Sequence, residues 1–251
     1  MLFRDFYGAK EVVSGLPRKC LWIDDSHIEF AQSIPPLANR LQRVASARAI
    51  MKDDKSAQKL AKVPHKFREQ FLGVRSTTVI PAITSENRAY LPVSVVEGDG
   101  VVGHKCYAMY DAPLWNMALV ASRSHWVWIG IVCARMRTDF SYSNTLGWNT
   151  FPVPLLTEQN KADLTTCSEN ILLAREAHFP ATIADLYDPE AMPDNLRHAH
   201  ERNDETLERI YIGRRFKNDT ERLEKLFEPY TKMRAAKKTK PAAKAVRGRK
   251  A

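Results

Sequence analysis

The chain has 251 residues, of which 44% are hydrophobic and 27% are charged, and its net charge is +9. This length supports one large or two small domains, and this composition excludes a fibrous, collagen-like or wholly disordered protein. The charge is uneven: residues 1–150 carry a net +6, residues 151–231 a net −6 and residues 232–251 a net +9. A basic block favours a polyanionic partner, nucleic acid above all, and a solubility tail on an ordinary enzyme is the alternative.

The first 155 residues predict an α+β domain with a mixed sheet. A long helix is expected over residues 36–62 and a short one over 114–122, while the apolar residues 126–134 fit either a helix or a strand. Strands are predicted where short apolar runs stand between turn-forming or charged residues, at 19–23, 77–83, 90–96 and 105–110.

The acidic second half predicts a small all-α domain. Apolar residues recur at helical spacing over residues 157–178, 194–212 and 220–233, and Thr157 is placed to cap the first of these helices. Two prolines predict a turn over residues 185–193. From residue 235 the chain has almost nothing apolar to bury. We therefore expect an α+β domain over residues 1–155, a helical domain over 156–233 and a disordered basic tail over 234–251.

Four dispersed cysteines favour reduced thiols in a cytoplasmic protein. No apolar run is long enough for a membrane span, and the first residues lack the apolar centre of a signal peptide. His198 and His200 are two residues apart, so on a helix they would face different sides and would not share a metal ion. No metal site and no catalytic residue is predicted.

Residues 98–103 read Gly-Asp-Gly-Val-Val-Gly and match the glycine pattern of dinucleotide-binding loops. That loop requires a helix that begins at the last glycines, because the helix N-terminus contacts the phosphates. Residues 104–109 look extended instead. We therefore interpret Asp99 and Gly100 as a hairpin turn between two strands.

Residues 35–75 contain ten lysines and arginines against three acidic residues. Five lysines follow one another at steps of three and four, which would place them on one face of a helix. Such a face complements the phosphates of DNA, and a solvated surface stripe is the alternative. Pro64 would end the helix before the last of these lysines, Lys66. The predicted contacts to the DNA backbone are Arg40, Arg43, Arg48, Lys52, Lys55, Lys59 and Lys62.

Arg137, Asp139 and Ser141 alternate along a segment that follows an apolar run. On an extended strand all three side chains would point to one face. Arginine can donate to the O6 and N7 atoms of guanine, and aspartate can accept from the N4 amino group of cytosine. The pair Arg137 and Asp139 could therefore read one G·C base pair, and a surface ion pair is the alternative.

Eight short segments, in order along the chain, resemble the MmeI-like family of type IIG/IIL restriction-modification enzymes. They are residues 8–11, 19–23, 81–92, 122–126, 139–143, 149–154, 184–193 and 221–230. The first half of the chain resembles the target recognition domain of that family, and the second half resembles its helical C-terminal domain. Intact members are S-adenosylmethionine-dependent adenine-N6 DNA methyltransferases, fused to an endonuclease.

The resemblance implies double-stranded DNA as the partner. It also implies base readout by Arg137, Asp139 and Ser141, and from the turn that contains His104 and Lys105. The chain has no Asn-Pro-Pro-Tyr or Asn-Pro-Pro-Phe motif to hold a flipped adenine. We therefore expect a DNA recognition module that lacks the catalytic part and neither binds S-adenosylmethionine nor transfers a methyl group alone.

Three alternatives remain open on the sequence. The first is a separately encoded specificity subunit that acts with a methyltransferase chain. The second is a protein-interaction module without DNA specificity, and the third is an intact enzyme of another class without a recognisable motif.

Overall fold

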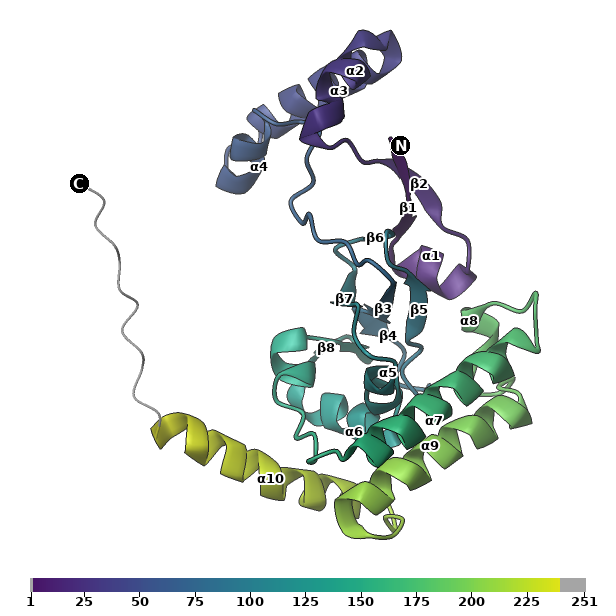
Figure 1. Cartoon of the computed structure of the whole chain (residues 1–251). Coiled ribbons are helices and arrows are strands. Elements are labelled where there is room, and N and C mark those ends of the chain that lie inside the picture. The colour runs from purple at the N-terminus through teal and green to yellow at the C-terminus, as the bar shows by residue number, and fades with distance from the viewer. Residues whose placement is uncertain (1, 240–251) are drawn as a thin grey trace. The chain divides into compact units, whose positions relative to one another are not determined.

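The computed structural model describes residues 2–239, and the chain folds into two compact units. Unit 1 contains the residues up to Ile83 together with Pro92–Pro113 and His178–Ala191. Unit 2 contains Thr84–Leu91, Leu114–Ala177 and the described residues from Met192 onward. Packing therefore joins segments that lie far apart in the sequence. The chain combines runs of helices with runs of short strands, which confirms the predicted α+β class (Figure 1).

The described part of unit 1 contains two three-stranded sheets. In the first, β1 (Phe3–Tyr7) is central, with β2 (Arg18–Leu21) antiparallel on one side and β6 (Val101–Val102) parallel on the other. In the second, β3 (Ser76–Pro81) is central and pairs antiparallel with β5 (Ser94–Glu97) and β7 (Cys106–Tyr110). The first sheet is mixed, as predicted, and the second is purely antiparallel.

The strand predictions are confirmed in part. Residues 77–83 and 105–110 correspond closely to β3 and β7, and a two-residue strand, β4 (Ile83–Thr84), follows β3. Residues 19–23 are not a buried strand, because β2 lies at the edge of its sheet and its first residues are exposed. Only the end of residues 90–96 joins β5, because a proline within that run lacks the N–H group that a strand ladder requires.

The glycine-rich segment 98–103 is shaped by its contacts with β1. A Cβ atom on Gly100 would lie 2.6 Å from the Tyr7 ring, and one on Gly103 would lie 2.6 Å from the Phe6 ring. The chain after Gly103 turns and enters β7, so the extended structure predicted there is confirmed. The hairpin is wrong, because β5 and β6 belong to different sheets. Since aromatic rings fill the space beside these glycines and a strand follows them, this segment does not fit a nucleotide cofactor.

The helices of unit 1 are short except for α3, which has 15 residues. They are α1 (Ala9–Ser14), η1 (Asp25–His27), α2 (Ile28–Ser33), α3 (Pro35–Ala49), α4 (Lys55–Leu60) and α8 (Ile183–Leu186). The single helix predicted over residues 36–62 is wrong, because the chain leaves α3 and starts again at α4. The Asp54 carboxylate accepts hydrogen bonds from the N–H groups of Ser56 and Ala57 at 3.0 and 2.9 Å. This N-cap stabilises a separate helix start in the middle of the predicted one.

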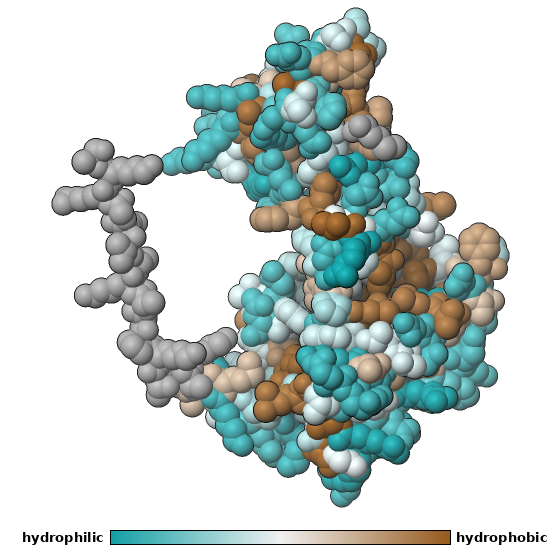
Figure 2. Space-filling view, viewed as in Figure 1, coloured by the Kyte–Doolittle hydropathy of each residue, from teal (hydrophilic) through white to brown (hydrophobic). Residues whose placement is uncertain are grey.

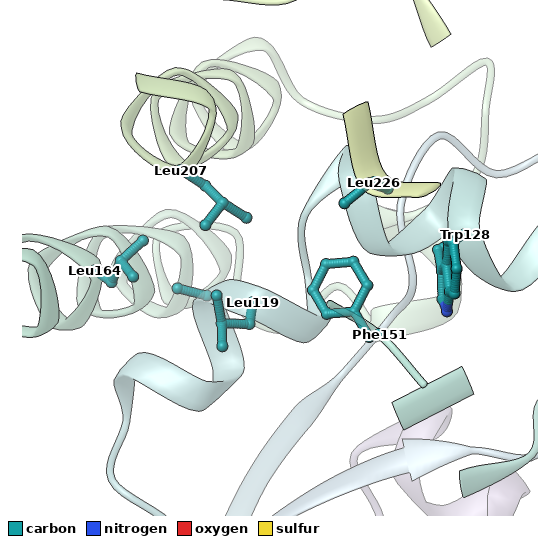
Figure 3. Close-up of a cluster of buried hydrophobic side chains, with 7 residues drawn as sticks. Leu119, Trp128, Phe151, Leu164, Leu207 and Leu226 are labelled. Atoms are coloured by element: carbon teal, nitrogen blue, oxygen red, sulfur yellow. The ribbon is translucent and has the colours of Figure 1, made fainter. Parts of the chain in front are cut away.

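Unit 2 contains most of the long helices. Its elements are α5 (Trp115–Val120), α6 (Arg123–Val132), β8 (Ala134–Met136), β9 (Asp139–Ser141), η2 (Asn144–Trp148), α7 (Glu158–Glu176), α9 (Asp194–Ile212) and α10 (Asp219–Thr239). Figure 3 shows the core that these helices share. Its buried side chains include Leu119, Trp128, Phe151, Leu164, Leu207 and Leu226.

The helix predictions for the second half are confirmed. The α9 bounds agree with the prediction, and in α7 the Thr157 hydroxyl accepts a hydrogen bond from Asn160 N at 3.1 Å. The ambiguous residues 126–134 lie mostly in helix α6. The predicted turn over 185–193 begins inside the short helix α8. Helix α10 continues to Thr239, and the rest of the expected basic tail lies outside the described residues.

Over residues 2–239, no helix combines the length and the apolar composition that a membrane crossing needs. Within the same residues, no cluster of three or more His, Cys, Asp or Glu side chains is placed to hold a metal ion. His198 is exposed and His200 is buried, so the two side chains diverge, as their spacing predicts.

Candidate nucleic-acid interface

The strands β8 and β9 form a tight hairpin in unit 2. Met136 pairs with Asp139, so the loop consists only of Arg137 and Thr138. Arg137 has a φ of 59°, and a positive φ at the first loop residue is what two-residue hairpins require. A residue other than glycine in this conformation costs about 1–2 kcal/mol. Arg137 therefore lies at the tip of the hairpin.

This geometry corrects one prediction. Asp139 and Ser141 share a face of β9, as expected, but Arg137 precedes the strand and does not extend that face. The expected alternation required a continuous strand over all three residues. The chain reverses direction between Met136 and Asp139 instead.

The opposite face of the hairpin is anchored. The Arg135 side chain donates to the carbonyl oxygen of Thr138 at 2.9 Å and pairs with the Glu86 carboxylate. Its guanidinium also lies 4.6 Å from the centre of the Phe140 ring. Phe140 is buried and packs edge-on against Trp126, with ring centres 4.9 Å apart. These contacts hold the loop in one position, because they tie its backbone to the unit 2 core.

The polar side chains at the hairpin tip have no such partners. Arg137 is exposed, and Asp139 and Ser141 are half-buried. None of the three side chains makes a hydrogen bond or an ion pair within residues 2–239. The ion pair between Arg137 and Asp139, which was the alternative to base readout, is absent from the described structure. Their donors and acceptors remain available to a ligand.

The turn between β6 and β7, in unit 1, carries the other two predicted readout residues. His104 and Lys105 are both exposed. The turn is held through its backbone, because Cys106 N donates to Gly103 O and Ala82 N donates to Lys105 O, both at 2.9 Å. The two side chains border a cavity of about 580 Å³ that Lys10 and Arg18 also line. The turn therefore presents basic side chains on a fixed backbone.

The basic residues of α3 and α4 form two short sets rather than one stripe. Arg40 and Arg43 are exposed on α3, and Lys55 and Lys59 are exposed on α4. Two more exposed lysines flank α4, namely Lys52 and Lys62. Hydrophilic and apolar residues are interspersed on the surface that Figure 2 shows for α2, α3 and α4.

Arg48 and Lys66 are engaged within the protein. The Arg48 guanidinium donates to the carbonyl oxygens of Leu60 and Pro64 at 3.2 and 3.3 Å, and burial lowers its pKa. Lys66 lies 2.6 Å from the Asp25 carboxylate, whose pKa is lowered by the hydrogen bonds from Lys66 and His65. Arg48 therefore ties the end of α3 to the end of α4 and to the segment after it, a role that the sequence did not reveal.

Sequence reasoning also missed the buried charges on α9. The Asp204 carboxylate accepts hydrogen bonds from the Tyr90 hydroxyl at 2.9 Å and from Arg123 N at 2.7 Å. Burial raises the pKa of Asp204 to about 7. The sequence does contain a signal for them: titratable residues recur every four positions beside the apolar face of α9, at His200, Asp204 and Glu208. Through its hydrogen bond from Arg123 N, Asp204 holds the start of α6, the helix that leads into the hairpin.

Comparison with known proteins identifies the family of both halves of the chain. The family model of the MmeI target recognition domain matches residues 1–155, and that of the MmeI C-terminal domain matches residues 156–236. The chain is 35% identical over 231 residues to DNA methyltransferase A of Bacillus subtilis (strain 168), covering 92% of the chain and 26% of that protein.

A solved structure is also similar. It is the type IIL restriction-modification enzyme MmeI in complex with DNA, with a TM-score of 0.87 and 29% sequence identity over 93% of this chain. The match covers 31% of the MmeI chain. The present chain therefore spans between a quarter and a third of the length of these relatives.

Proposed function

The chain belongs to the MmeI family, because the models of the MmeI target recognition and C-terminal domains match it. We propose that it is the sequence-specific DNA recognition module of an adenine-N6 DNA methyltransferase or restriction-modification enzyme. The observation that carries the proposal is the β8–β9 hairpin, an anchored loop whose tip presents polar side chains without protein partners. The similar enzyme MmeI was solved in complex with DNA, which supports DNA as the ligand here.

We assign base readout first to Arg137 and Asp139. The Arg137 guanidinium donates to guanine O6 and N7, and the Asp139 carboxylate accepts from cytosine N4 in the same base pair. Ser141, His104 and Lys105 supply further base contacts. The two-residue loop of this hairpin enters the major groove, where all four base pairs can be distinguished.

Contacts to the DNA backbone come from the exposed basic residues of α3 and α4 and their flanks. Each phosphate that these residues neutralise adds about 0.9 to the slope of log affinity against log salt. Such contacts position the protein on the duplex without selecting a sequence. The proposed set is Arg40, Arg43, Lys52, Lys55, Lys59 and Lys62. A contact of Arg48 with the DNA backbone stays a prediction, and in the structure its side chain donates to two carbonyl oxygens of the protein.

Methyl transfer, S-adenosylmethionine and any nuclease activity belong, in this proposal, to parts of the relatives that the present chain does not span. In this proposal residues 1–155 carry target recognition and residues 156–233 form a supporting helical domain; the two family models, which match residues 1–155 and 156–236, support this division. A methyltransferase domain or subunit is then the second partner. The four cysteines are free in the structure, which supports the reducing, cytoplasmic setting expected for such an enzyme.

The test exchanges the two readout residues. Duplexes with a randomised site are selected for binding to the wild-type chain and to the Arg137→Glu/Asp139→Arg variant. Donor and acceptor move in space, so we expect the preferred base pair to change at one position of the site, by about 1–3 kcal/mol of discrimination. Parallel measurements at several salt concentrations give the number of phosphate contacts.

The outcomes separate the alternatives. The same recognition sequence for both proteins would mean that Arg137 and Asp139 are structural. Binding of the wild-type chain without any sequence preference would contradict a recognition module, and absence of binding to duplex DNA at low salt would favour a protein-interaction module.

A further inference from the structure

The face of the β8–β9 hairpin that carries Asp139 also carries apolar residues. Residues that oppose each other in an antiparallel pair have their side chains on the same side of the sheet. Met136 pairs with Asp139, and Ala134 pairs with Ser141. Arg135 and Phe140 occupy the other face, which is packed against Trp126. The outward face therefore combines two polar residues with two apolar ones.

Met136 is unusual for its position. Its side chain is 58% exposed, and the residue adjoins Arg137 in sequence and opposes Asp139 across the hairpin. Single exposed apolar residues are common on protein surfaces and by themselves require no explanation. This one lies within the group of residues assigned to base readout, because its side chain shares a face of the hairpin with Asp139.

The chemistry of the major groove limits what that thioether can recognise. The base edges in this groove present hydrogen-bond donors and acceptors, with one apolar group, the C5-methyl of thymine. Apolar side chains contact this methyl group in protein–DNA complexes. Methionine is unbranched and flexible, so its side chain can reach along the groove from the hairpin tip.

We propose that Met136 is a specificity-determining residue that contacts the 5-methyl group of a thymine beside the G·C pair read by Arg137 and Asp139. The inference rests on the proposed function, because it requires the hairpin to enter the major groove. It adds an apolar contact to a site described so far by hydrogen bonds alone. A thymine is thus selected by the burial of its methyl group.

The experiment removes that methyl group and nothing else. The site selected by the wild-type chain is synthesised with each thymine replaced in turn by deoxyuridine, and the affinity of each duplex is measured. Burial of one methyl-sized group is worth about a fourfold change in affinity. We expect one replacement to weaken wild-type binding by about that factor, and the Met136→Ala variant to bind both duplexes equally.

Met51→Ala is the matched control, because Met51 is similarly exposed, at 50%, and lies outside the hairpin. This variant should keep the discrimination of the wild-type chain. Thermal unfolding of each variant checks that the fold is retained.

Three results would overturn the inference while leaving DNA recognition intact. They are a selected site without thymine on either strand, wild-type binding that no uracil replacement weakens, and discrimination that persists in Met136→Ala. Absence of any sequence preference would instead contradict the proposed function itself.

Discussion

Two parts of unit 2 contain the same residue types, arginines and carboxylates, and use them in opposite ways. Between α9 and α10, the buried Glu208 carboxylate accepts hydrogen bonds from Phe216 N at 2.8 Å and from the Arg222 side chain at 2.5 and 2.8 Å. At the hairpin tip, Arg137 and Asp139 have no partner among the described residues. A buried charge must be paired within the fold, whereas a charge in contact with water needs no protein partner and can bind a ligand. The surroundings of a charged side chain in the fold, rather than its residue type, therefore decide whether it stabilises the protein or is available to bind a ligand.

The largest expected effect comes from breaking the buried network. Glu208→Ala leaves the Arg222 guanidinium partly buried beside Asp219 and removes the acceptor for Phe216 N. Loss of one partner of a buried ion pair costs about 3–5 kcal/mol. We expect a loss of that size in the free energy of unfolding, measured by chemical denaturation.

Glu205→Ala is the control for this measurement. Glu205 lies on the same helix and pairs with Arg209 at the surface, at 2.5 Å. An exposed pair contributes about 0–1 kcal/mol. An equal loss of stability in both variants would contradict the contrast between buried and exposed charges.

A smaller effect should appear in the pH dependence of stability. Burial raises the pKa of the Asp204 carboxyl to about 7, from an ordinary value of 3.8. The folded protein therefore holds a proton between these values that the unfolded chain releases. The contribution of Asp204 to the free energy of unfolding therefore falls as pH rises from about 4 to about 7, by at most about 1.4 kcal/mol per pH unit.

Asp204→Asn should remove this contribution. The amide oxygen can still accept from Arg123 N, and the amide nitrogen can donate to the Tyr90 hydroxyl, so the hydrogen bonds are retained. The measurement is denaturant unfolding of both proteins at a series of pH values. Parallel profiles over this range would mean that Asp204 is ionised in the folded protein.

The smallest expected change in stability lies at the hairpin tip. Asparagine tolerates a positive φ better than arginine, so Arg137→Asn should leave the free energy of unfolding unchanged or raise it by up to about 1 kcal/mol. The same variant should lose its preference at one base pair. Arg135→Ala, two residues earlier, should lower stability, because it removes the contacts with Glu86 and Phe140. Thermal unfolding and site selection on both variants distinguish a residue kept for recognition from one kept for stability.

The long helices were predictable because their signals are local. In α9, the apolar positions repeat over nineteen residues, and in α7 the capping residue Thr157 stands directly before the helix. Between α3 and α4 the local signals conflicted: the lysine spacing suited one helix, but Asp54 is also a good N-cap. The cap was decisive, and the continuous basic stripe was lost with the helix.

The candidate site was predictable only as a set of residues. The sequence singled out Arg137, Asp139 and Ser141 as candidate readout residues, but the reversal at Arg137 had no sequence signal, because Arg-Thr is not a preferred hairpin loop. The support from Arg135 was also invisible, since Glu86 lies forty-nine residues away. Sequence spacing cannot report a contact that two distant segments make after folding.

The sequence by itself determined the α+β class, the long helices of the second half and, through its ordered series of short motifs, the family to which the chain belongs. Periodicity, caps and motifs are properties of neighbouring residues, so they can be read before folding. Only the tertiary structure decided which charges are paired and which are free. Arg48 and Arg137 look alike in the sequence, but the first donates to the carbonyls of Leu60 and Pro64 and the second lies unpartnered on an anchored loop. Pairing depends on which distant groups packing brings within hydrogen-bonding distance.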